Sequence, residues 1–287
     1  MIQDEIDKIN SRFWKLPVTK VKGRVGPGEV QALRLPPPKS HKGQNGKLLI
    51  IGGSALFHGA PLLAAKTASR ICDYVFFAST PENNQLVKKL KSRLSTFIAV
   101  PQKELSTYIG QADCILIGTG LGATEKTKKL TESLLRKYPA KKWVIDADSL
   151  KIADPKFLPK NCVVTPHKKE FEMLFDCPPS TENVIKMAKK FWAIIVLKGK
   201  VDVICTPTEC KFNYTGNSGM TKGGTGDVIA GMLAGFACKN DLFLSSCAAT
   251  FINGLAGDRL FERVSYFFNA EDLSEEVPPT LKWCLDF

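Results

Sequence analysis

The sequence predicts an α/β fold with a mostly parallel central sheet, and two patterns support this prediction. Short apolar runs of strand length recur along the chain, and segments with helical periodicity lie between them. The runs are continuously apolar, which is typical of strands buried on both faces of a parallel sheet. With 287 residues the chain is long enough to bury such a core.

The first 40 residues precede this pattern. They predict a short amphipathic helix and then an arm rich in proline and glycine, whose final stretch at 35–46 (LPPPKSHKGQNG) excludes regular structure. We find no internal repeat and no interdomain linker beyond the arm. We therefore expect residues 1–40 to be an arm of the same unit and residues 41–287 to form a single domain.

The remaining elements follow in order along the chain. Strands are expected at 47–53, 74–79, 114–120, 143–148, 162–167 and 193–199, with helices at 60–72, 125–138 and 181–191. Residues 201–214 predict an antiparallel hairpin at the sheet edge that turns near 207–210.

Charge and hydropathy limit the partners and the location of the protein. The net charge is +12, but the lysines are spread in pairs, without a basic arm or an aromatic RNA-binding motif. We therefore expect a solvated basic surface and no nucleic-acid partner. No apolar run is long enough to span a membrane, and the N-terminus is acidic where a signal peptide would be basic. These features predict a soluble, cytoplasmic protein without a membrane partner.

Cysteine and histidine usage offers little support for a metal site. The nine cysteines form no C-x-x-C pair and are odd in number, so we expect reduced thiols. The three histidines form no H-E-x-x-H motif.

The most informative stretch is 215–235 (TGNSGMTKGGTGDVIAGMLAG), where a glycine-rich loop leads into an apolar helix from about Thr225. Glycines allow a ligand to approach the backbone, and the N-terminus of a helix attracts anions. We therefore predict an anion hole built by Gly223, Gly224, Thr225 and Gly226. Asp227 at its edge would accept a proton from a hydroxyl group during phosphoryl transfer. The alternative is that Asp227 only caps the helix.

Other polar and glycine residues follow the predicted strands, at the edge where ligands bind in parallel sheets. Gly118–Gly122 is a poor match to a dinucleotide fingerprint, and no P-loop motif is present. Lys198 with Gly199 could hold phosphates or be a surface turn, and His167 could contact a ligand or be structural. Asp146 and Asp148 alternate on one strand, so they should point to opposite faces, one toward the ligand edge and one toward the next helix.

Taken together, several segments resemble the NAD(P)H-hydrate dehydratase family of the ribokinase-like superfamily. They are 41–46, 52–70, 118–122, 144–150, 164–171, 196–204 and 215–235, and the N-x-G-x-x-x-G-G-T-G-D block is the most specific. The resemblance implies a three-layer α/β/α fold and one ribokinase-like catalytic domain. It also implies a nucleotide-dependent repair enzyme that phosphorylates the C6 hydroxyl of (S)-hydrated NADH or NADPH and then eliminates phosphate.

The resemblance also implies site residues and partners. The substrate hydrate would contact Ala60, Gly120, His167 and Asp227, and the nucleotide, ADP or ATP, would contact Lys198, Gly199, Lys200, Val201, Asp202 and Gly226. Asp227 would be the catalytic base, with its pKa lowered by the helix dipole. Mg²⁺ is expected, although no protein ligand can be named for it. The family further implies a homotetramer or a larger homo-oligomer and a functional link to a separate epimerase, for which this chain has no room.

Some features leave alternatives open. Ser149, Lys169 and Asp202 stand where the family more often has other residues, which leaves the nucleotide contact of Asp202 in doubt. A small-molecule kinase, for instance of a thiamine precursor, could use the same anion hole and aspartate. A non-catalytic binder of polyanions is the remaining alternative. The choices between ADP and ATP, and between NADH and NADPH, stay open.

Overall fold

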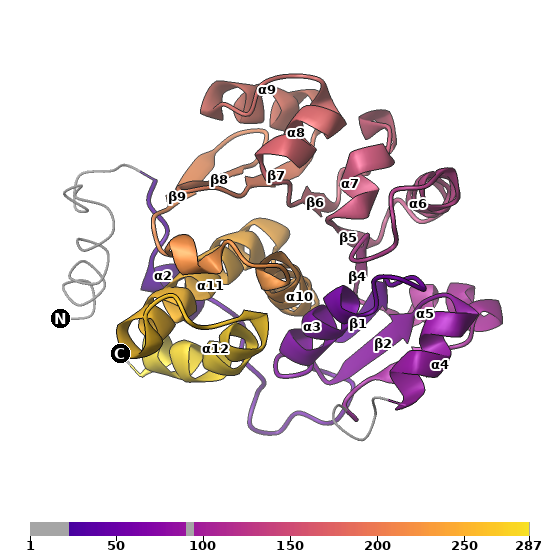
Figure 1. Cartoon of the computed structure of the whole chain (residues 1–287), viewed down its shortest axis with the longest axis horizontal. Helices are drawn as coiled ribbons and strands as arrows, with labels where there is room; N and C mark the ends of the chain where they lie inside the picture. Colours follow the sequence, from indigo (N-terminus) through magenta and orange to yellow (C-terminus); the bar gives the residue numbers. More distant parts are fainter. Residues whose placement is uncertain (1–22, 90–94, 287) are drawn as a thin grey trace.

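A nine-stranded sheet forms the centre of the protein in the computed structural model, which describes residues 23–89 and 95–286 (Figure 1). The strand order is β3-β2-β1-β4-β5-β6-β7-β8-β9. The strands are β1 (Lys47–Ile51), β2 (Tyr74–Ala78), β3 (Ile98–Val100), β4 (Cys114–Ile117), β5 (Lys142–Ile145), β6 (Cys162–Val164), β7 (Ile194–Leu197), β8 (Asp202–Cys205) and β9 (Cys210–Asn213). The first seven in this order pair in parallel, and β8 and β9 are antiparallel.

Helices cover both faces of the sheet (Figure 1). One layer consists of α2 (Pro27–Gln31), α3 (Gly59–Ala68), α10 (Thr225–Ala237), α11 (Leu242–Val264) and α12 (Ala270–Leu285). The other consists of α5 (Leu105–Gln111), α6 (Glu125–Lys137), α7 (Asp148–Ile152), α8 (Lys168–Phe175) and α9 (Thr181–Phe191). Helix α4 (Pro81–Lys89) lies beside β3. The predicted α/β fold with three layers and a mostly parallel sheet is therefore confirmed.

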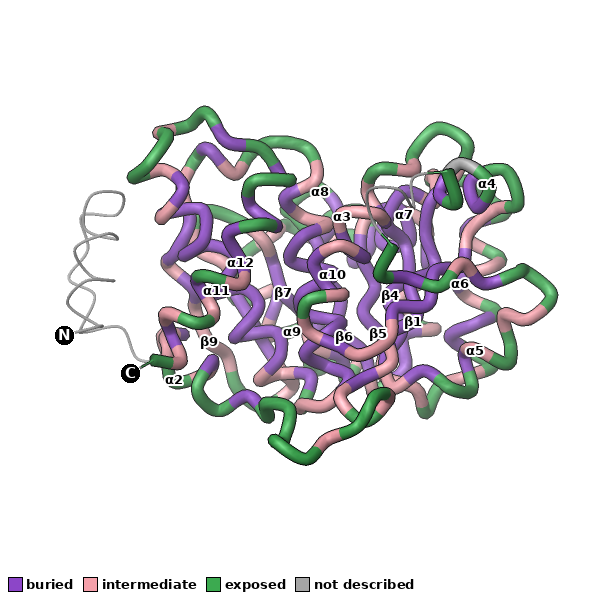
Figure 2. The backbone as a smooth tube through the Cα atoms, turned by 90° about the horizontal axis from the view of Figure 1, so that it is seen from below, coloured by how far each residue is buried: buried purple, intermediate pink, exposed green. Residues whose placement is uncertain are grey.

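Each strand contributes to two separate cores, which explains its continuous apolar sequence. In β1, Leu48 and Ile50 pack against the layer that contains α10, whereas Leu49 and Ile51 pack against the opposite layer. All four side chains are buried. The tube in Figure 2 shows the same feature, because β1, β4, β5, β6 and β7 run through its buried interior. Burial on both faces removes the alternation of apolar and polar residues seen in one-sided sheets.

The predicted strands and the edge hairpin are present, although most strands end two or three residues earlier than expected. The strand β3 was missed, and the helices that were not among the predicted ranges are α2, α4, α5, α7, α8, α11 and α12. β3 has only three residues and lies at the sheet edge, where Ile98 is exposed, so it lacks the long apolar run of a central strand. Within the described ranges, no helix combines the length and apolar composition needed to cross a membrane.

The N-terminal arm is attached to the edge of the sheet. The N–H of Val25 donates to the carbonyl of Phe212 at 2.9 Å, and the N–H of Phe212 donates to the carbonyl of Gly23 at 2.9 Å. The short helix α2 follows, and the stretch 35–46 contains no helix or strand, as predicted. The predicted amphipathic helix near the N-terminus lies outside the described residues.

The expectation of reduced thiols is wrong for one pair of cysteines. Cys205 and Cys210 form a disulfide across the β8–β9 hairpin, where the strand register places them opposite each other. The other seven cysteines, all within the described ranges, are free. The sequence predicts the hairpin but not its register, so this pairing could not be read from it.

Candidate active site

A cavity of about 930 Å³ opens at the carboxyl ends of the central strands, beside the N-terminus of α10. The loop after β7 and the glycine-rich loop before α10 contribute most of its lining, and α11 adds Asn253 and Gly254. His167, Ile229 and Tyr266 complete it. The predicted site residues that line it are His167, Lys198, Gly199, Lys200, Asp202, Thr225 and Gly226. Ala60, Gly120, Val201, Gly223, Gly224 and Asp227 do not line this cavity.

The glycine-rich loop leads into α10 as predicted. Gly224 is the N-cap residue with φ of 96°, and a Cβ atom there would lie 2.6 Å from Leu63 Cδ1. Only glycine fits this conformation and this close packing. Within the described part of the chain, the backbone N–H groups of Gly223, Gly224 and Gly226 find no acceptor. These donors and the helix dipole favour an anion at this point.

Two residues of the loop have structural roles that hold it in shape. The hydroxyl of Thr225 donates to the carbonyl of Met220 at 2.8 Å, and the ammonium of Lys222 donates to the carbonyls of Tyr266 and Phe268. Asp227 lies in the first turn of α10, three residues after the N-cap, and its side chain forms no cap hydrogen bond. The capping alternative for Asp227 is therefore wrong.

A buried ion pair lies under the loop. Lys198 Nζ is 2.9 Å from Asp146 Oδ1, which also accepts a hydrogen bond from the hydroxyl of Thr165 at 2.7 Å. Lys198 is close to the start of α10, because a Cβ atom on Gly226 would lie 3.5 Å from its Nζ. Lys198 is thus fixed in place at the cavity wall, and the alternative of a free surface lysine is wrong.

The carboxyl group of Asp227 has an unusually high pKa of about 7. Burial is the main cause, and the nearby carboxylates of Asp146, Asp148 and Glu170 add to it, whereas Lys198 opposes the shift. The predicted lowering of this pKa by the helix dipole is therefore wrong, because burial and the neighbouring carboxylates outweigh the dipole. A pKa near 7 suits a group that must accept a proton at neutral pH.

Lys198 stays charged despite its surroundings. Burial is the largest single influence and lowers the pKa of Lys198, but Asp146, Glu170 and Asp227 together raise it, so the net shift is upward. Burial also raises the pKa of the Glu170 carboxyl group. The cluster therefore surrounds one ammonium group with several carboxyl groups, some of which are easily protonated.

His167 follows β6 and is the N-cap residue of α8. Its Nδ1 accepts a hydrogen bond from the N–H of Glu170 at 3.2 Å, and the Glu170 carboxylate accepts one from the N–H of His167 at 3.0 Å. This capping box fixes the imidazole while its other side stays accessible, since half of the side chain is exposed. His167 therefore has both a structural role and a surface facing the cavity.

Ala60 and Gly120 lie on the side of the loop that faces α3. Gly120 has φ of 67°, and a Cβ atom there would lie 2.7 Å from the carbonyl oxygen of Phe57 and 3.3 Å from Pro61. Ala60 precedes Pro61 in the first turn of α3, the helix whose Leu63 touches Gly224. The structure thus places these two residues near each other at the start of α3, and neither lines the cavity.

Asp202 stabilises the turn between β7 and β8. Its carboxylate accepts hydrogen bonds from the N–H of Gly199 and from the side-chain amide of Asn213, both at 2.9 Å. Burial raises the pKa of Asp202 to about 6. The turn holds the exposed Lys200 at the cavity and the half-buried Val201 away from it.

Sequence reasoning did not assign a site role to Glu170 or Asn253, and it left open which of Asp146 and Asp148 faces the ligand edge. Asp146 follows β5 and binds Lys198, whereas Asp148 begins α7 and accepts a hydrogen bond from the N–H of Gly122 at 2.8 Å. The prediction that the two alternate on one strand is wrong, because β5 ends at Ile145 and both carboxylates lie near enough to Asp227 to raise its pKa. The spacing of Glu170 from His167 was the available signal for a capping box. Asn253 lines the cavity, and its buried Oδ1 has no partner among the described residues. No motif in the sequence around Asn253 indicates this position.

The donor set does not suit a resident metal ion. The described residues contain no group of three His, Cys, Asp or Glu side chains placed to bind one. Asp146, a buried carboxylate of the site, is already paired with Lys198. Mg²⁺ that is bound mainly by phosphates and water does not need such a group.

The fold and the position of this site define a class of enzyme. A ribokinase-like superfamily protein from Enterococcus faecalis has the same fold, with a TM-score of 0.83 and 25% identity over 91% of this chain and 96% of the other. The structure of the ADP/ATP-dependent NAD(P)H-hydrate dehydratase from Bacillus subtilis, co-crystallized with ATP/Mg²⁺, matches with a TM-score of 0.77 and 24% identity, over 92% and 99% of the two chains. The protein therefore has the ribokinase-like fold.

Sequence comparison gives the family within this class. The family model described as NAD(P)H-hydrate dehydratase matches residues 48–279, so the chain belongs to this family. The bifunctional NAD(P)H-hydrate repair enzyme of Methanocaldococcus jannaschii is 39% identical over 96% of this chain, which spans 56% of that relative's length. The ADP-dependent (S)-NAD(P)H-hydrate dehydratase of Nitrosopumilus maritimus is 35% identical over 85% of this chain and 91% of its own length.

Proposed function

We propose that the protein dehydrates the (S) form of hydrated NADH or NADPH in a nucleotide-dependent reaction that restores the cofactor. The observation that carries this proposal is the N-terminus of α10, where unpaired N–H groups lie within one turn of Asp227, whose pKa is about 7. Together they combine an anion site with a proton acceptor, and phosphorylation of a hydroxyl group requires both. The names of the two relatives described above support the choice of substrate.

The two sides of the glycine-rich loop would hold the two substrates. The nucleotide occupies the cavity of about 930 Å³, which is within the usual range for a ligand site. Its phosphates bind Lys198, Gly199, Lys200 and Gly226, while Asp202 and Val201 form the turn that presents them. The hydrate would contact Ala60 and Gly120 beside the loop and reach His167 at the edge of the cavity, with its C6 hydroxyl directed toward Asp227.

The reaction follows from these positions. Asp227 accepts the proton of the C6 hydroxyl as the hydroxyl oxygen attacks the terminal phosphorus of the nucleotide. The phosphoanhydride bond breaks, and AMP leaves when the donor is ADP, or ADP when the donor is ATP. The N–H groups of Gly223, Gly224 and Gly226 stabilise the charge on the transferred phosphoryl group. Cleavage of the C6–O bond then releases phosphate, a proton leaves the adjacent carbon, and the ring double bond is restored. Mg²⁺ bound to the nucleotide would offset the charge of its phosphates.

We further propose ADP as the donor, in keeping with the name of the Nitrosopumilus relative. We also propose that residues 41–287 act as one catalytic unit, that the enzyme works as a homotetramer in the cytoplasm, and that a separate epimerase supplies the (S) hydrate. Light scattering measures the mass of the assembly, and a mass of one chain would contradict the tetramer.

A direct assay tests the proposed function. The purified protein is incubated with (S)-hydrated NADH, Mg²⁺ and either ADP or ATP, and the near-ultraviolet absorbance of reduced nicotinamide is followed. We expect recovery of NADH with ADP, together with release of one phosphate per NADH. No recovery with either nucleotide would rule out the dehydratase. Phosphorylation of a thiamine precursor instead would support the small-molecule kinase.

A further inference from the structure

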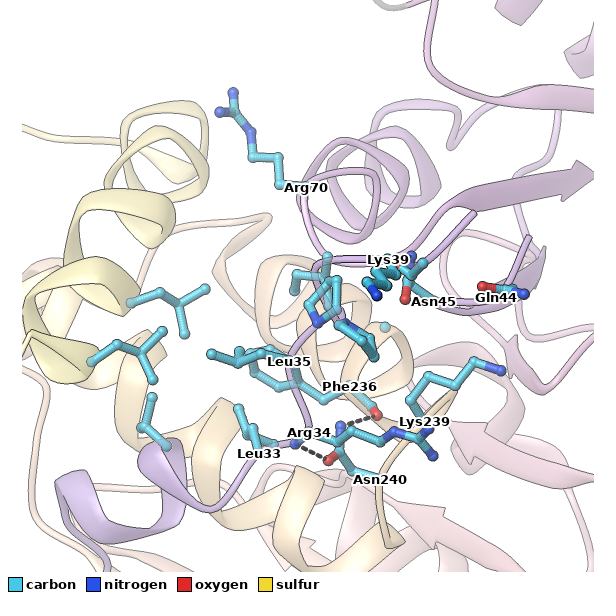
Figure 3. Close-up of a pocket in the computed structure, with 18 residues that line it drawn as sticks. Leu33, Arg34, Leu35, Lys39, Gln44, Asn45, Arg70, Phe236, Lys239 and Asn240 are labelled. Atoms are coloured by element: carbon cyan, nitrogen blue, oxygen red, sulfur yellow. Dashed lines mark hydrogen bonds between the residues drawn. The ribbon is translucent and has the colours of Figure 1, made fainter. Parts of the chain in front are cut away.

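A second cavity, of about 480 Å³, lies at the other end of the helices that carry the active site (Figure 3). Helix α10 begins at the glycine-rich loop, where Leu63 of α3 packs against Gly224. Residues at the far ends of these two helices line this cavity, namely Arg70, Ile71, Gly235, Phe236, Lys239 and Asn240. The arm at 30–45 and the last turns of α12 complete the lining. A helix of the length of α10 spans roughly 20 Å, so the two cavities are distinct.

Basic residues surround this cavity, and no acidic residue among those that the structure describes lines it. The basic residues are Arg34, Lys39, Arg70 and Lys239. Arg70 points away from the other labelled side chains in Figure 3 and pairs with Glu275 at 2.6 Å, and Lys239 lies 3.4 Å from Asp113. Within the described part of the chain, Arg34 and Lys39 have no ionic partner. These two side chains leave uncompensated positive charge at the cavity.

The floor of the cavity is apolar and is held in place by hydrogen bonds. Leu33 and Phe236 are buried in it, and Ile71, Leu281 and Leu285 lie around them. The N–H of Arg34 donates to Asn240 Oδ1 at 2.7 Å, and Asn240 Nδ2 donates to the carbonyl of Phe236 at 2.9 Å (Figure 3). These contacts fasten the arm to the end of α10, so the cavity is formed without a ligand.

We propose that this cavity is a binding site for a small organic anion with an apolar body. The apolar floor would bury the body of such a molecule, and Arg34 and Lys39 would pair with its acidic group. The volume is within the range of small-molecule sites, and a neutral ligand would leave the charges unused. The site lies apart from the active site, so the proposal does not depend on the dehydratase reaction.

Fluorescence of 1-anilinonaphthalene-8-sulfonate tests the site, because this probe joins an aromatic body to a sulfonate. We expect the full chain to bind one probe molecule, with saturating ADP and Mg²⁺ present to fill the active-site cavity. N-phenyl-1-naphthylamine, which has a similar body but no sulfonate, should bind at least about tenfold more weakly. Equal binding of the two probes, or displacement of the sulfonate by ADP, would overturn the proposal.

Variants assign the binding to this cavity. The double substitution Arg34→Glu with Lys39→Glu should weaken binding of the sulfonate by about tenfold or more, because it replaces both unpaired cations. The control, Lys126→Glu with Lys129→Glu on the exposed side of α6, makes the same change in net charge and should leave binding unchanged. Arg34→Lys with Lys39→Arg should keep binding within about twofold.

A last substitution tests the apolar lining at an exposed position, where the change should not disturb the fold. Leu35 is half exposed at the cavity, so Leu35→Asp should weaken binding of the sulfonate probe. It should not unfold the chain, which circular dichroism can check. Unchanged binding in both Leu35→Asp and the double glutamate variant would overturn the proposal.

Discussion

The two ends of α10 differ in how their backbone groups are satisfied. At the C-terminal end, the carbonyl of Phe236 accepts a hydrogen bond from Asn240 Nδ2, and the carbonyl of Ala237 accepts one from Lys142 Nζ. At the N-terminal end, the N–H groups of Gly224 and Gly226 have no acceptor in the described part of the chain. One helix therefore has a closed end and an open end.

This difference separates stability from function. Unpaired polar groups at a helix end cost free energy unless water or a ligand satisfies them, so a protein has reason to cap both ends. Here the chain caps the end that lies away from the active site and leaves open the end beside Asp227. We therefore expect substitutions at the open end to affect turnover most, and substitutions at the closed end to affect stability alone.

The largest effect is expected from Asp227→Asn at the open end. The amide keeps the size of the side chain but accepts no proton, so kcat should fall by about 10³-fold or more. Binding of ADP, measured by calorimetry, should stay within about threefold, because the backbone donors remain in place. A variant that keeps full turnover would show that Asp227 is not the base.

The next largest effect is expected from Gly224→Ala. An alanine would have to adopt φ of 96° and would place its Cβ 2.6 Å from Leu63 Cδ1 and 2.8 Å from the Cβ of Ala270. The loop must shift, which should reduce kcat/KM by roughly 10²-fold. Gly223→Ala is the matched control, because its Cβ would meet no atom within 4 Å, and it should keep most of the activity. Equal losses in both variants would show that packing of the loop is not the cause.

The pH dependence is a third way to test the open end. Asp227 must be ionised to accept a proton, and its pKa is about 7, so kcat/KM should fall about tenfold for each pH unit below 7. The folded state raises this pKa, so it favours the protonated form and loses stability as pH rises from 4 to 7. Thermal unfolding should therefore show Asp227→Asn gaining more over the wild type at pH 8 than at pH 5. An equal gain at both pH values would contradict the raised pKa.

The contrast between the two ends also shows what the sequence can reveal. The open end was predicted because its signals are local: glycines, a helix start and an aspartate lie within five residues. The central strands were predicted for a similar reason, since burial on both faces makes each of them apolar throughout. The resemblance to a family named the remaining candidate site residues, but it gave no information on their burial or on their neighbours in space.

Features that depend on distant residues were missed. The pKa of Asp227 is set by burial and by Asp146, Asp148 and Glu170, which lie more than 50 residues away in the chain and reach the site only through the sheet. The disulfide depends on the register of a hairpin, and the cavity-lining Asn253 depends on how α11 packs. Sequence patterns describe the neighbours of a residue along the chain, whereas these properties come from its neighbours in space.

The smallest effect on activity is expected at the closed end, from Lys142→Met. Lys142 Nζ donates to the carbonyls of Ala237 and Asn240 at 2.8 and 2.7 Å, and methionine would fill the same space without a donor. Leaving two partly buried carbonyls unpaired should lower the free energy of unfolding by about 1–3 kcal/mol, measured by urea denaturation. Below the unfolding transition kcat/KM should stay within about twofold, since the open end is unchanged. A large loss of kcat/KM in the folded variant would mean that the two ends of α10 are coupled, and that capping one end helps to hold the other in its active shape.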